Sequence, residues 1–386
     1  MTANTQQEII GLQDQRRRVS VRDTDLALFE ALHEGRFLTT ALITEEFFSH
    51  RNAANRRLKQ LLDAGYIDRD QESVTKDAIW RPTQKAITAL VDAGRLARDQ
   101  ATWTWKQSLS AITYKEHETE VNKLRFTLLR HAPRYAGVRV DRCLSGPALY
   151  DAITDHDGTR YPVRPDRFLE LSVEGTTFHY LIEVDRGSKD LKSAKKRDVS
   201  DQLYAYNPYY LRGGFLRKYG NPSDPVNAWP FRVLVTAPTP SRRNNIIERM
   251  IAELAERGQP PGTMRGYALF EEVIADPFQP LWIRESEVDR ILKWLERLPV
   301  DRPLGTAVPA DRFPDVREAL GERWLIRSYR RSRSRPEEAH KAPVRDTELR
   351  DAFLDALIRT GRLQRFSILE RSWRGKEKST RHDPVH

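Results

Sequence analysis

The sequence predicts a chain of the α+β or α/β class with more than one domain. Its 386 residues exceed the roughly 100 to 200 residues of a usual domain. Residues 20–98 have the pattern of three helices followed by a hairpin. In residues 112–298 strands alternate with helices, which is typical of a mixed sheet with flanking helices. Residues 299–386 are expected to form a basic, partly flexible C-terminal extension with a short helix.

The composition favours a polyanionic partner and excludes several classes of protein. The formal net charge is +10, and Lys and Arg near phosphates release condensed counterions, although an anionic membrane would also attract this charge. No apolar run reaches the roughly 18 residues that span a bilayer, and the first residues lack the apolar centre of a signal peptide. We therefore expect a cytoplasmic protein without a membrane partner. The single cysteine, Cys143, excludes an internal disulfide and a cysteine-clustered zinc site, and we expect it to be a small buried apolar residue.

Helical periodicity predicts three helices in the first hundred residues. Apolar side chains recur at helical spacing through residues 22–34, and a glycine follows. Thr39 or Thr40 can cap a second short helix, because a threonine hydroxyl accepts a hydrogen bond from the first helical turn. Residues 52–64 are expected to form the third helix. Its buried stripe consists of Leu58, Leu61 and Leu62.

A hairpin follows the three helices, with strands at residues 66–69 and 78–81 joined by a polar turn. This is the order of elements in a winged helix-turn-helix, whose third helix contacts base edges in the major groove of double-stranded DNA. The residues expected at the DNA are Arg51, Asn52, Asn55, Arg56, Arg57 and Lys59, with Lys76 and Arg81 on or beside the wing. Alternatively, these charges form the solvated face of a surface helix, since acidic residues nearly balance basic ones in this region.

The next predicted helix, over about residues 114–130, places one histidine toward the core. His117, Val121, Leu124 and Leu128 share one stripe, so His117 points inward. A core histidine held by a hydrogen bond is one interpretation, and an active-site residue is the other.

Carboxylates are expected to meet on two neighbouring strands, at residues 163–173 and 176–187. If Glu174 and Gly175 form a two-residue turn, the pairing places Asp166 opposite Glu183. Because side chains alternate along a strand, Asp185 is expected on the same face as Glu183. Leucine side chains then pack on the opposite face.

Like charges opposite one another destabilise a sheet, so these three carboxylates need a compensating cation. Hard divalent cations favour carboxylate oxygens, and Mg²⁺ or Mn²⁺ beside a scissile phosphate can orient water and stabilise developing charge. We therefore predict that Asp166, Glu183 and Asp185 are catalytic, metal-binding residues. The alternative is an ion-pair network, in which the carboxylates pair with Arg164, Arg167 or Arg186.

Basic and aromatic residues follow the carboxylates. A helix is expected to carry Lys189, Lys192, Lys195 and Lys196 and to continue to Tyr204 and Tyr206. One of these lysines could neutralise a phosphate or activate water, and one of the tyrosines could attack phosphorus; Lys189, Lys192 and Tyr204 are the residues we select. The alternative is solvated lysines and half-buried aromatic rings. Further elements complete the mixed sheet: strands at residues 231–238 and 267–272, a helix at 244–256 and a segment at 281–286.

The order helix, three strands, helix and strand, with a Pro-Asp pair and then Glu-Val-Asp, resembles the PD-(D/E)XK nuclease fold. The chain to about residue 290 is similar to the plasmid replication-relaxation family. The similarity rests on RFLTTALITEEFF, NRRLKQLLDAGYIDR, RPDRFLEL and LIEVDRGS, with His117 and Asn122 on the helix between them. The resemblance implies a role in replication and relaxation of plasmid or other mobile DNA, and related mobilisation relaxases nick one strand.

The resemblance also implies residue roles. Asp166 and Glu183 match the two metal-binding carboxylates of the nuclease motif, and Glu118 or Glu120 could match a helix glutamate that some of these nucleases add. At the position where the motif has lysine, this sequence has Asp185. A lysine of the following helix would therefore have to supply the positive charge of the motif lysine.

Three hypotheses follow. The first is a metal-dependent DNA nickase or relaxase of a mobile element, working with other relaxosome or replication proteins. The second, which Asp185 favours, is a non-catalytic origin-binding or transcription-regulating protein that kept the nuclease scaffold. The third is an adaptor whose winged helix contacts protein. The C-terminal residues predict either a phosphate clamp or a solubilising tail, with a helix over residues 346–358, and the sequence predicts no oligomeric state.

Overall fold

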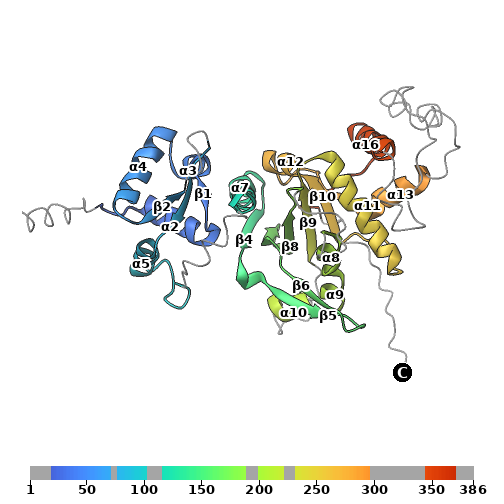
Figure 1. Ribbon diagram of the computed structural model, residues 1–386, viewed down its shortest axis with the longest axis horizontal. Coiled ribbons are helices and arrows are strands. Elements are labelled where there is room, and N and C mark those ends of the chain that lie inside the picture. The colour runs from blue at the N-terminus through green and yellow to red at the C-terminus, as the bar shows by residue number, and fades with distance from the viewer. Residues whose placement is uncertain are drawn as a thin grey trace, which may run out of the picture. The chain divides into compact units, whose positions relative to one another are not determined.

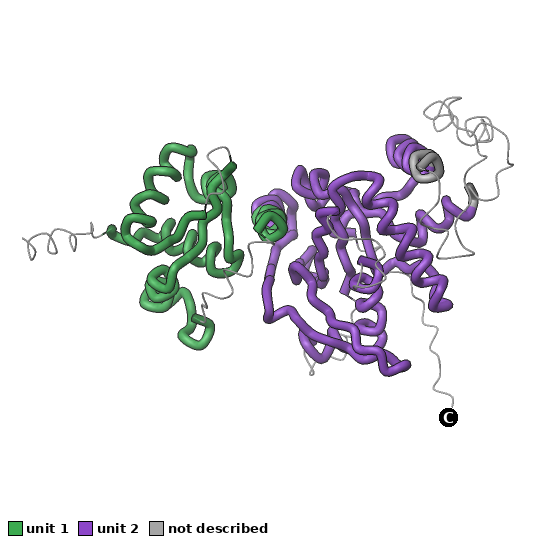
Figure 2. The backbone as a smooth tube through the Cα atoms, in the orientation of Figure 1, with its two compact units in different colours: residues 1–126 green, residues 127–386 purple. Residues whose placement is uncertain are grey.

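A computed structural model describes residues 19–70, 76–101, 115–187, 199–220, 231–295 and 344–370. The chain divides into two compact units, residues 1–126 and 127–386 (Figure 2). The division falls within helix α7 (Lys115–His131).

Unit 1 combines helices with a small sheet (Figure 1). Its elements are α2 (Asp23–Gly35), β1 (Leu38–Thr39), α3 (Thr40–Phe47), α4 (Arg51–Asp63), β2 (Ile67–Asp70), β3 (Ile79–Pro82) and α5 (Gln84–Asp92). The strands are antiparallel in the order β1-β3-β2. Three helices and a hairpin therefore occur in the predicted order.

Caps and a buried stripe explain why these helices form where they do. The Thr39 hydroxyl accepts a hydrogen bond from the Leu42 N–H at 3.2 Å, as expected of a helix cap. The His50 ring caps α4 by accepting from the Ala53 N–H at 3.2 Å. Leu58 and Leu61 are fully buried, which confirms the predicted stripe, whereas Leu62 is only half-buried.

Unit 2 is built on a six-stranded mixed sheet in the order β11-β10-β9-β8-β7-β4. The strands are β4 (Val138–Leu144), β7 (Arg167–Val173), β8 (Thr176–Val184), β9 (Arg232–Ala237), β10 (Arg265–Leu269) and β11 (Ile283–Arg284). Strands β8, β9 and β10 run parallel, while β4, β7 and β11 pair antiparallel with their neighbours. A separate ribbon consists of β5 (Asp151–Thr154) and β6 (Arg160–Val163), which the sequence did not predict.

The β7–β8 hairpin has the predicted register. Leu169 pairs with Tyr180, and the turn residues Glu174 and Gly175 have φ angles of 48° and 76°. Positive φ at both positions is the geometry of a two-residue turn that matches the twist of the strands.

Several helices belong to unit 2, and the first of them, α7, begins in unit 1. They are α7, α8 (Val199–Tyr204), α9 (Tyr206–Leu211), α10 (Gly214–Tyr219), α11 (Pro240–Glu256), α12 (Phe270–Ala275), α13 (Glu285–Leu295) and α16 (Val344–Arg359). Helix α11 packs on β9 and β10, and α13 and α16 pack on α11 (Figure 1). The strand predicted at residues 267–272 ends at Leu269, because Phe270 begins α12.

Both faces of the hairpin are packed in cores. The prediction assigned only the face of Leu169 and Leu171 to a core, but Phe168 and Leu181, on the face of Asp166 and Glu183, are also fully buried. Central strands of a sheet with parallel neighbours are commonly covered on both sides, and this places Glu183 under the helices that carry Gln202 and Tyr206.

The C-terminal part of unit 2 differs from the predicted extension. Phe353, Leu354 and Leu357 of α16 are at most 4% exposed and belong to the core shared with the sheet. The Tyr180 hydroxyl donates to the Ile368 carbonyl at 2.6 Å, and Trp282 pairs with Phe366. Residues 344–370 therefore complete the fold of unit 2. The predicted flexible basic segment and the basic end of the chain lie outside the described residues.

Two further expectations concern single features. Cys143 lies on β4 and is half-buried, not fully buried as expected, because its strand is the last one of the sheet. Among the described helices, none combines the length and the apolar character that a membrane span requires.

Candidate functional site

Asp166 and Glu183 lie together at one end of the β7–β8 hairpin. The Asp166 N–H donates to the Ile182 carbonyl at 3.0 Å, which extends the ladder by one residue. The Asp166 Oδ2 accepts a hydrogen bond from the Val184 N–H at 2.8 Å. The hairpin backbone thus fixes the Asp166 carboxylate beside residue 183, as the predicted pairing requires.

Two helical side chains hold Glu183, which is 6% exposed. Its Oε2 accepts a hydrogen bond from the Gln202 Nε2 at 2.7 Å, and its Oε1 accepts one from the Tyr206 hydroxyl. Burial, and then the charges of Glu183 and Asp166, raise the pKa of Tyr206 well above its usual value. Tyr206 therefore stays protonated and donates to Glu183.

Asp185 does not join these carboxylates in a metal-binding group. Its Oδ2 accepts from the Arg242 Nε at 2.7 Å and its Oδ1 from the Arg242 Nη2 at 2.9 Å, which is a bidentate ion pair. The prediction that three carboxylates converge is wrong because strand alternation applies only within a strand, and β8 ends at Val184. No group of three or more His, Cys, Asp or Glu side chains suited to a metal ion occurs among the described residues.

The alternative prediction, an ion pair, is confirmed for Asp185, but its partner is Arg242 and not one of the three arginines that we expected. Arg242 comes from the first turn of α11, more than fifty residues along the chain, where the Thr239 hydroxyl caps the helix by accepting from the Arg242 N–H at 3.2 Å. Arg164 instead lies over the Tyr150 ring, at 5.4 Å from its centroid.

Tyr204 lies in the core of unit 2, where it cannot attack phosphorus as predicted. Its side chain is 2% exposed, and the Arg257 guanidinium lies 3.9 Å from the centroid of its ring. Its hydroxyl accepts a hydrogen bond from the Gln259 Nε2 at 3.3 Å. The helix phase therefore directs Tyr206, not Tyr204, to the carboxylates.

The other predicted catalytic residues are not placed at this site. Lys189 and Lys192 lie outside the described residues. His117 and Glu120 are half-buried on the part of α7 that belongs to unit 1, so a catalytic role for them stays a prediction.

Gln202 is a functional candidate that the sequence did not predict, and Tyr206 was named on the predicted helix but not selected as a site residue. Their spacing of four residues places them on one helical face, because Ala205 between α8 and α9 keeps helical angles (φ −51°, ψ −26°). This spacing, directly after a strand that carries carboxylates, could have identified them.

The exposed face of α4 is a candidate nucleic-acid surface. Asn52, Asn55, Arg56 and Lys59 are exposed, as predicted from the helical pattern. Lys59 forms an ion pair with Asp63 at 3.3 Å, four residues along the helix. Arg51 forms an ion pair with Asp77 at 2.8 Å, and Asp77 also accepts from the Ala41 N–H at the start of α3.

Arg57 was predicted to lie at the DNA, and this prediction is wrong. It is 8% exposed and binds Asp25, which is 1% exposed, through its Nε at 2.8 Å and through its Nη2. It also donates to the Gln60 Oε1 at 2.9 Å and to the Ser20 carbonyl at 2.8 Å. Arg57 therefore joins α4 to α2 and does not belong to the exposed face.

The two basic residues at the wing differ from each other. Arg81 is half-buried and pairs with Asp68 on the neighbouring strand at 3.3 Å, whereas Lys76 is exposed.

The fold and site define a two-unit chain: a small helical unit with a polar, basic helix face, and a mixed-sheet unit with a fixed acidic pair. The model of the replication-relaxation family matches residues 29–222, about half of the chain, and the protein belongs to this family. No match was found among curated proteins or among solved structures. Membership supports a role in the replication and relaxation of plasmid DNA.

Proposed function

We propose that this protein binds double-stranded DNA of a plasmid or other mobile element and nicks one strand in a reaction that depends on Mg²⁺ or Mn²⁺. The observation that carries the proposal is the fixed pair of carboxylates, Asp166 and Glu183, at one end of the β7–β8 hairpin. Asp166 is half-buried and Glu183 is 6% exposed, and two like charges held side by side repel each other. A divalent cation would compensate both carboxylates together.

The donor set fits a hard divalent cation. Mg²⁺ is commonly bound through one or two carboxylates together with substrate phosphates, so two carboxylates are sufficient without Asp185. A carboxylate has about four acceptor positions, so the hydrogen bonds from Gln202 and Tyr206 are compatible with coordination by Glu183.

The side chains of this site act by orientation. Gln202 and Tyr206 fix both oxygens of Glu183, and the Val184 N–H fixes Asp166, so neither carboxylate needs to reorganise when DNA arrives. When bound, the cation would polarise the scissile phosphate and lower the pKa of an attacking water. Arg242 holds the Asp185 carboxylate apart from the pair, which keeps a third negative charge from the approaching phosphate.

We further propose that the exposed face of α4 binds the DNA duplex, as the third helix of a winged helix-turn-helix. The face offers two asparagines that can hydrogen-bond base edges and two cations that can contact guanine or phosphate. This surface would select the site, and unit 2 would act on it.

The nicking proposal is tested with supercoiled plasmid that carries the cognate origin, incubated with the full chain and Mn²⁺. We expect wild type to produce nicked circles and the Asp166→Asn and Glu183→Gln variants to produce none. Glu271→Gln is the matched control, because Glu271 is an exposed carboxylate on α12 of the same unit. Absence of nicking by wild type, or equal nicking by all variants, contradicts the proposal.

The duplex-binding proposal is tested separately by gel shift without metal. Arg56→Ala combined with Lys59→Ala is expected to weaken binding and to lower its salt dependence, because each phosphate contact releases counterions. Lys85→Ala combined with Arg98→Ala removes the same charge from exposed positions of unit 1 off this face. An equal loss in both double variants would contradict a role for α4.

The second candidate function is a non-catalytic origin-binding protein. Asp185 stands where the nuclease motif has lysine, and its bidentate pairing with Arg242 favours this candidate. It predicts a protected DNA site in a footprint together with unchanged plasmid topology and no tight binding of Mn²⁺ by calorimetry.

A further inference from the structure

The ribbon of β5 and β6 has one buried and one open face. Ala152 pairs with Pro162 and Ile153 with Tyr161 across the ribbon. Ile153, Tyr161 and Val163 are at most 6% exposed and pack in the core of unit 2. Because side chains alternate along a strand, residues 152, 160 and 162 lie on the opposite, open face, and Arg164, directly after β6, is exposed.

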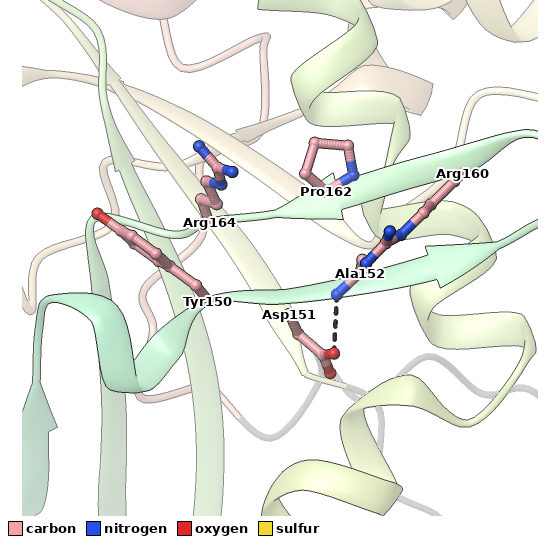
Figure 3. A pocket seen from close by; sticks show the side chains of 6 residues that line it. All are labelled: Tyr150, Asp151, Ala152, Arg160, Pro162 and Arg164. Atoms are coloured by element: carbon pink, nitrogen blue, oxygen red, sulfur yellow. Dashed lines mark hydrogen bonds between the residues drawn. The ribbon is translucent and has the colours of Figure 1, made fainter.

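This open face forms a pocket of about 610 Å³, which we call the ribbon pocket (Figure 3). Its lining consists of Tyr150, Asp151, Ala152, Arg160, Pro162 and Arg164. Figure 3 shows Tyr150 and Arg164 toward one end and Arg160 toward the other, with Pro162 between them. The volume lies in the range of about 300 to 1,000 Å³ that is usual for ligand pockets.

Tyr150 and Arg164 give one end of the ribbon pocket a flat, cationic surface. Tyr150 is 46% exposed, and the Arg164 guanidinium lies 5.4 Å from the centroid of its ring. Within the described residues, Arg164 has no carboxylate in an ion pair. Exposed aromatic rings and guanidinium planes are the surfaces on which unpaired bases stack.

The charge around the ribbon pocket is positive. Asp151 is the acidic residue of its lining, and it already accepts a hydrogen bond from the Tyr209 hydroxyl at 3.1 Å and lies 3.6 Å from the Arg217 Nη2. The Lys218 ammonium adds a cation at the pocket edge, where it donates to the Tyr150 carbonyl at 2.7 Å. An anionic ligand is therefore favoured.

We propose that the ribbon pocket binds an unpaired segment of single-stranded DNA, with a base stacked on Tyr150 and phosphates on Arg164 and Arg160. Arg160 begins β6 and Arg164 follows its last residue, so the two arginines lie toward opposite ends of the pocket and can contact different phosphates of one DNA strand (Figure 3). A base within a duplex is already stacked on its neighbours and cannot use the Tyr150 ring, which favours a single strand.

The position of the ribbon pocket connects it with the carboxylates. Arg164 precedes Asp166 by two residues, a separation of about 7 Å along an extended chain. A strand held by Arg164 would therefore pass close to Asp166. This last step rests on the proposed nicking function, whereas strand binding by the pocket does not.

Strand binding is measured by fluorescence anisotropy of a labelled oligothymidylate in EDTA. The full chain carries Arg56→Ala and Lys59→Ala, so that the face of α4 does not contribute. Tyr150→Ala is expected to weaken binding about 5- to 150-fold, the loss that corresponds to about 1–3 kcal/mol for one stacked base. Tyr150→Phe keeps the ring and should bind as the parent does. Arg164→Ala should lower the slope of log affinity against log salt by about 0.7.

Matched controls on unit 2 are Leu211→Ala and Arg290→Ala, which remove an exposed apolar side chain and an exposed arginine elsewhere. Equal affinity of the parent chain with Arg56→Ala and Lys59→Ala, and of its Tyr150→Ala and Arg164→Ala variants, for the oligothymidylate would overturn the proposal. An equal effect of Tyr150→Ala on a duplex of the same length would overturn the preference for a single strand. If strand binding requires Tyr150 but wild type does not nick plasmid, the pocket assignment stands and the proposed function fails.

Discussion

Removal of Arg57 tests the distinction between its structural position and the exposed face of α4. Arg57→Ala leaves Asp25 in place at 1% exposure, without the two hydrogen bonds from the guanidinium. Breaking one partner of a buried ion pair costs about 3–5 kcal/mol, because the other charge remains buried. A domain is typically stable by about 5–15 kcal/mol, so unit 1 would lose a large part of its stability.

The adjacent Arg56 provides the matched control, since Arg56→Ala removes the same side chain from the exposed face of the same helix and should change stability by less than about 0.5 kcal/mol. Arg57→Lys should not restore stability, because an ammonium group cannot form the two-point contact with Asp25. The assay is hydrogen exchange of backbone amides in α2 and α4 of the full chain, which reports the opening free energy of unit 1 alone. Unchanged protection in Arg57→Ala, with weakened DNA binding, would refute the structural role.

Three further predictions concern other parts of the chain. Burial lowers the pKa of His131, and hydrogen bonds led by the Tyr135 hydroxyl lower the pKa of Asp276 against the opposing effect of burial. Since the unfolded chain then binds more protons, urea denaturation should show unit 2 losing stability as the pH falls below about 6.5, and again below about 3.9. His131→Gln should remove part of the loss of stability that occurs below about pH 6.5. An unchanged dependence of stability on pH in this variant would contradict the role of His131. Gly35→Ala places a Cβ 2.6 Å from the Oδ1 of Asn122, whose amide donates to the Gly35 and Phe37 carbonyls, so thermal unfolding should show a loss of about 1–3 kcal/mol. Gly262→Ala is the control, because its Cβ would lie in ordinary contact, 3.8 Å from the Met264 nitrogen, and equal stability of the two variants would contradict this prediction. Finally, a chain that ends at residue 343 lacks α16, and its unit 2 should unfold at a lower urea concentration than that of a chain ending at residue 370. The reason is that each buried apolar side chain of α16 contributes about 1.5–3 kcal/mol to stability. Equal midpoints of urea unfolding for the two chains would contradict the packing of α16.

Local patterns in the sequence were sufficient for much of the fold. The period of apolar residues predicted the helices of unit 1, and the Glu174–Gly175 turn predicted the register of β7 and β8. Both inferences depend on interactions between residues close in sequence, so no tertiary information was needed. The opposition of Asp166 and Glu183 followed directly from that register.

Residues that depend on distant partners could not be predicted in this way. Arg57 was assigned to the exposed face because the pattern could not show that Asp25 lies beside it. Asp185 was assigned to a metal site because its partner, Arg242, lies on a helix far along the chain. The packing of α16 on the sheet domain was missed for the same reason, since a short helix after a long basic segment carries no sequence pattern that specifies its docking site.

The central claim is that Asp166 and Glu183 together bind a divalent cation. Crystals of the full chain grown with Mn²⁺ test it most directly, through anomalous scattering measured at the manganese absorption edge. The account predicts an anomalous peak within coordination distance of both the Asp166 and the Glu183 carboxylates, with Asp185 still paired to Arg242, and no such peak in Glu183→Gln crystals. Absence of a peak between Asp166 and Glu183, or a peak on Asp185 with Arg242 displaced, would contradict it.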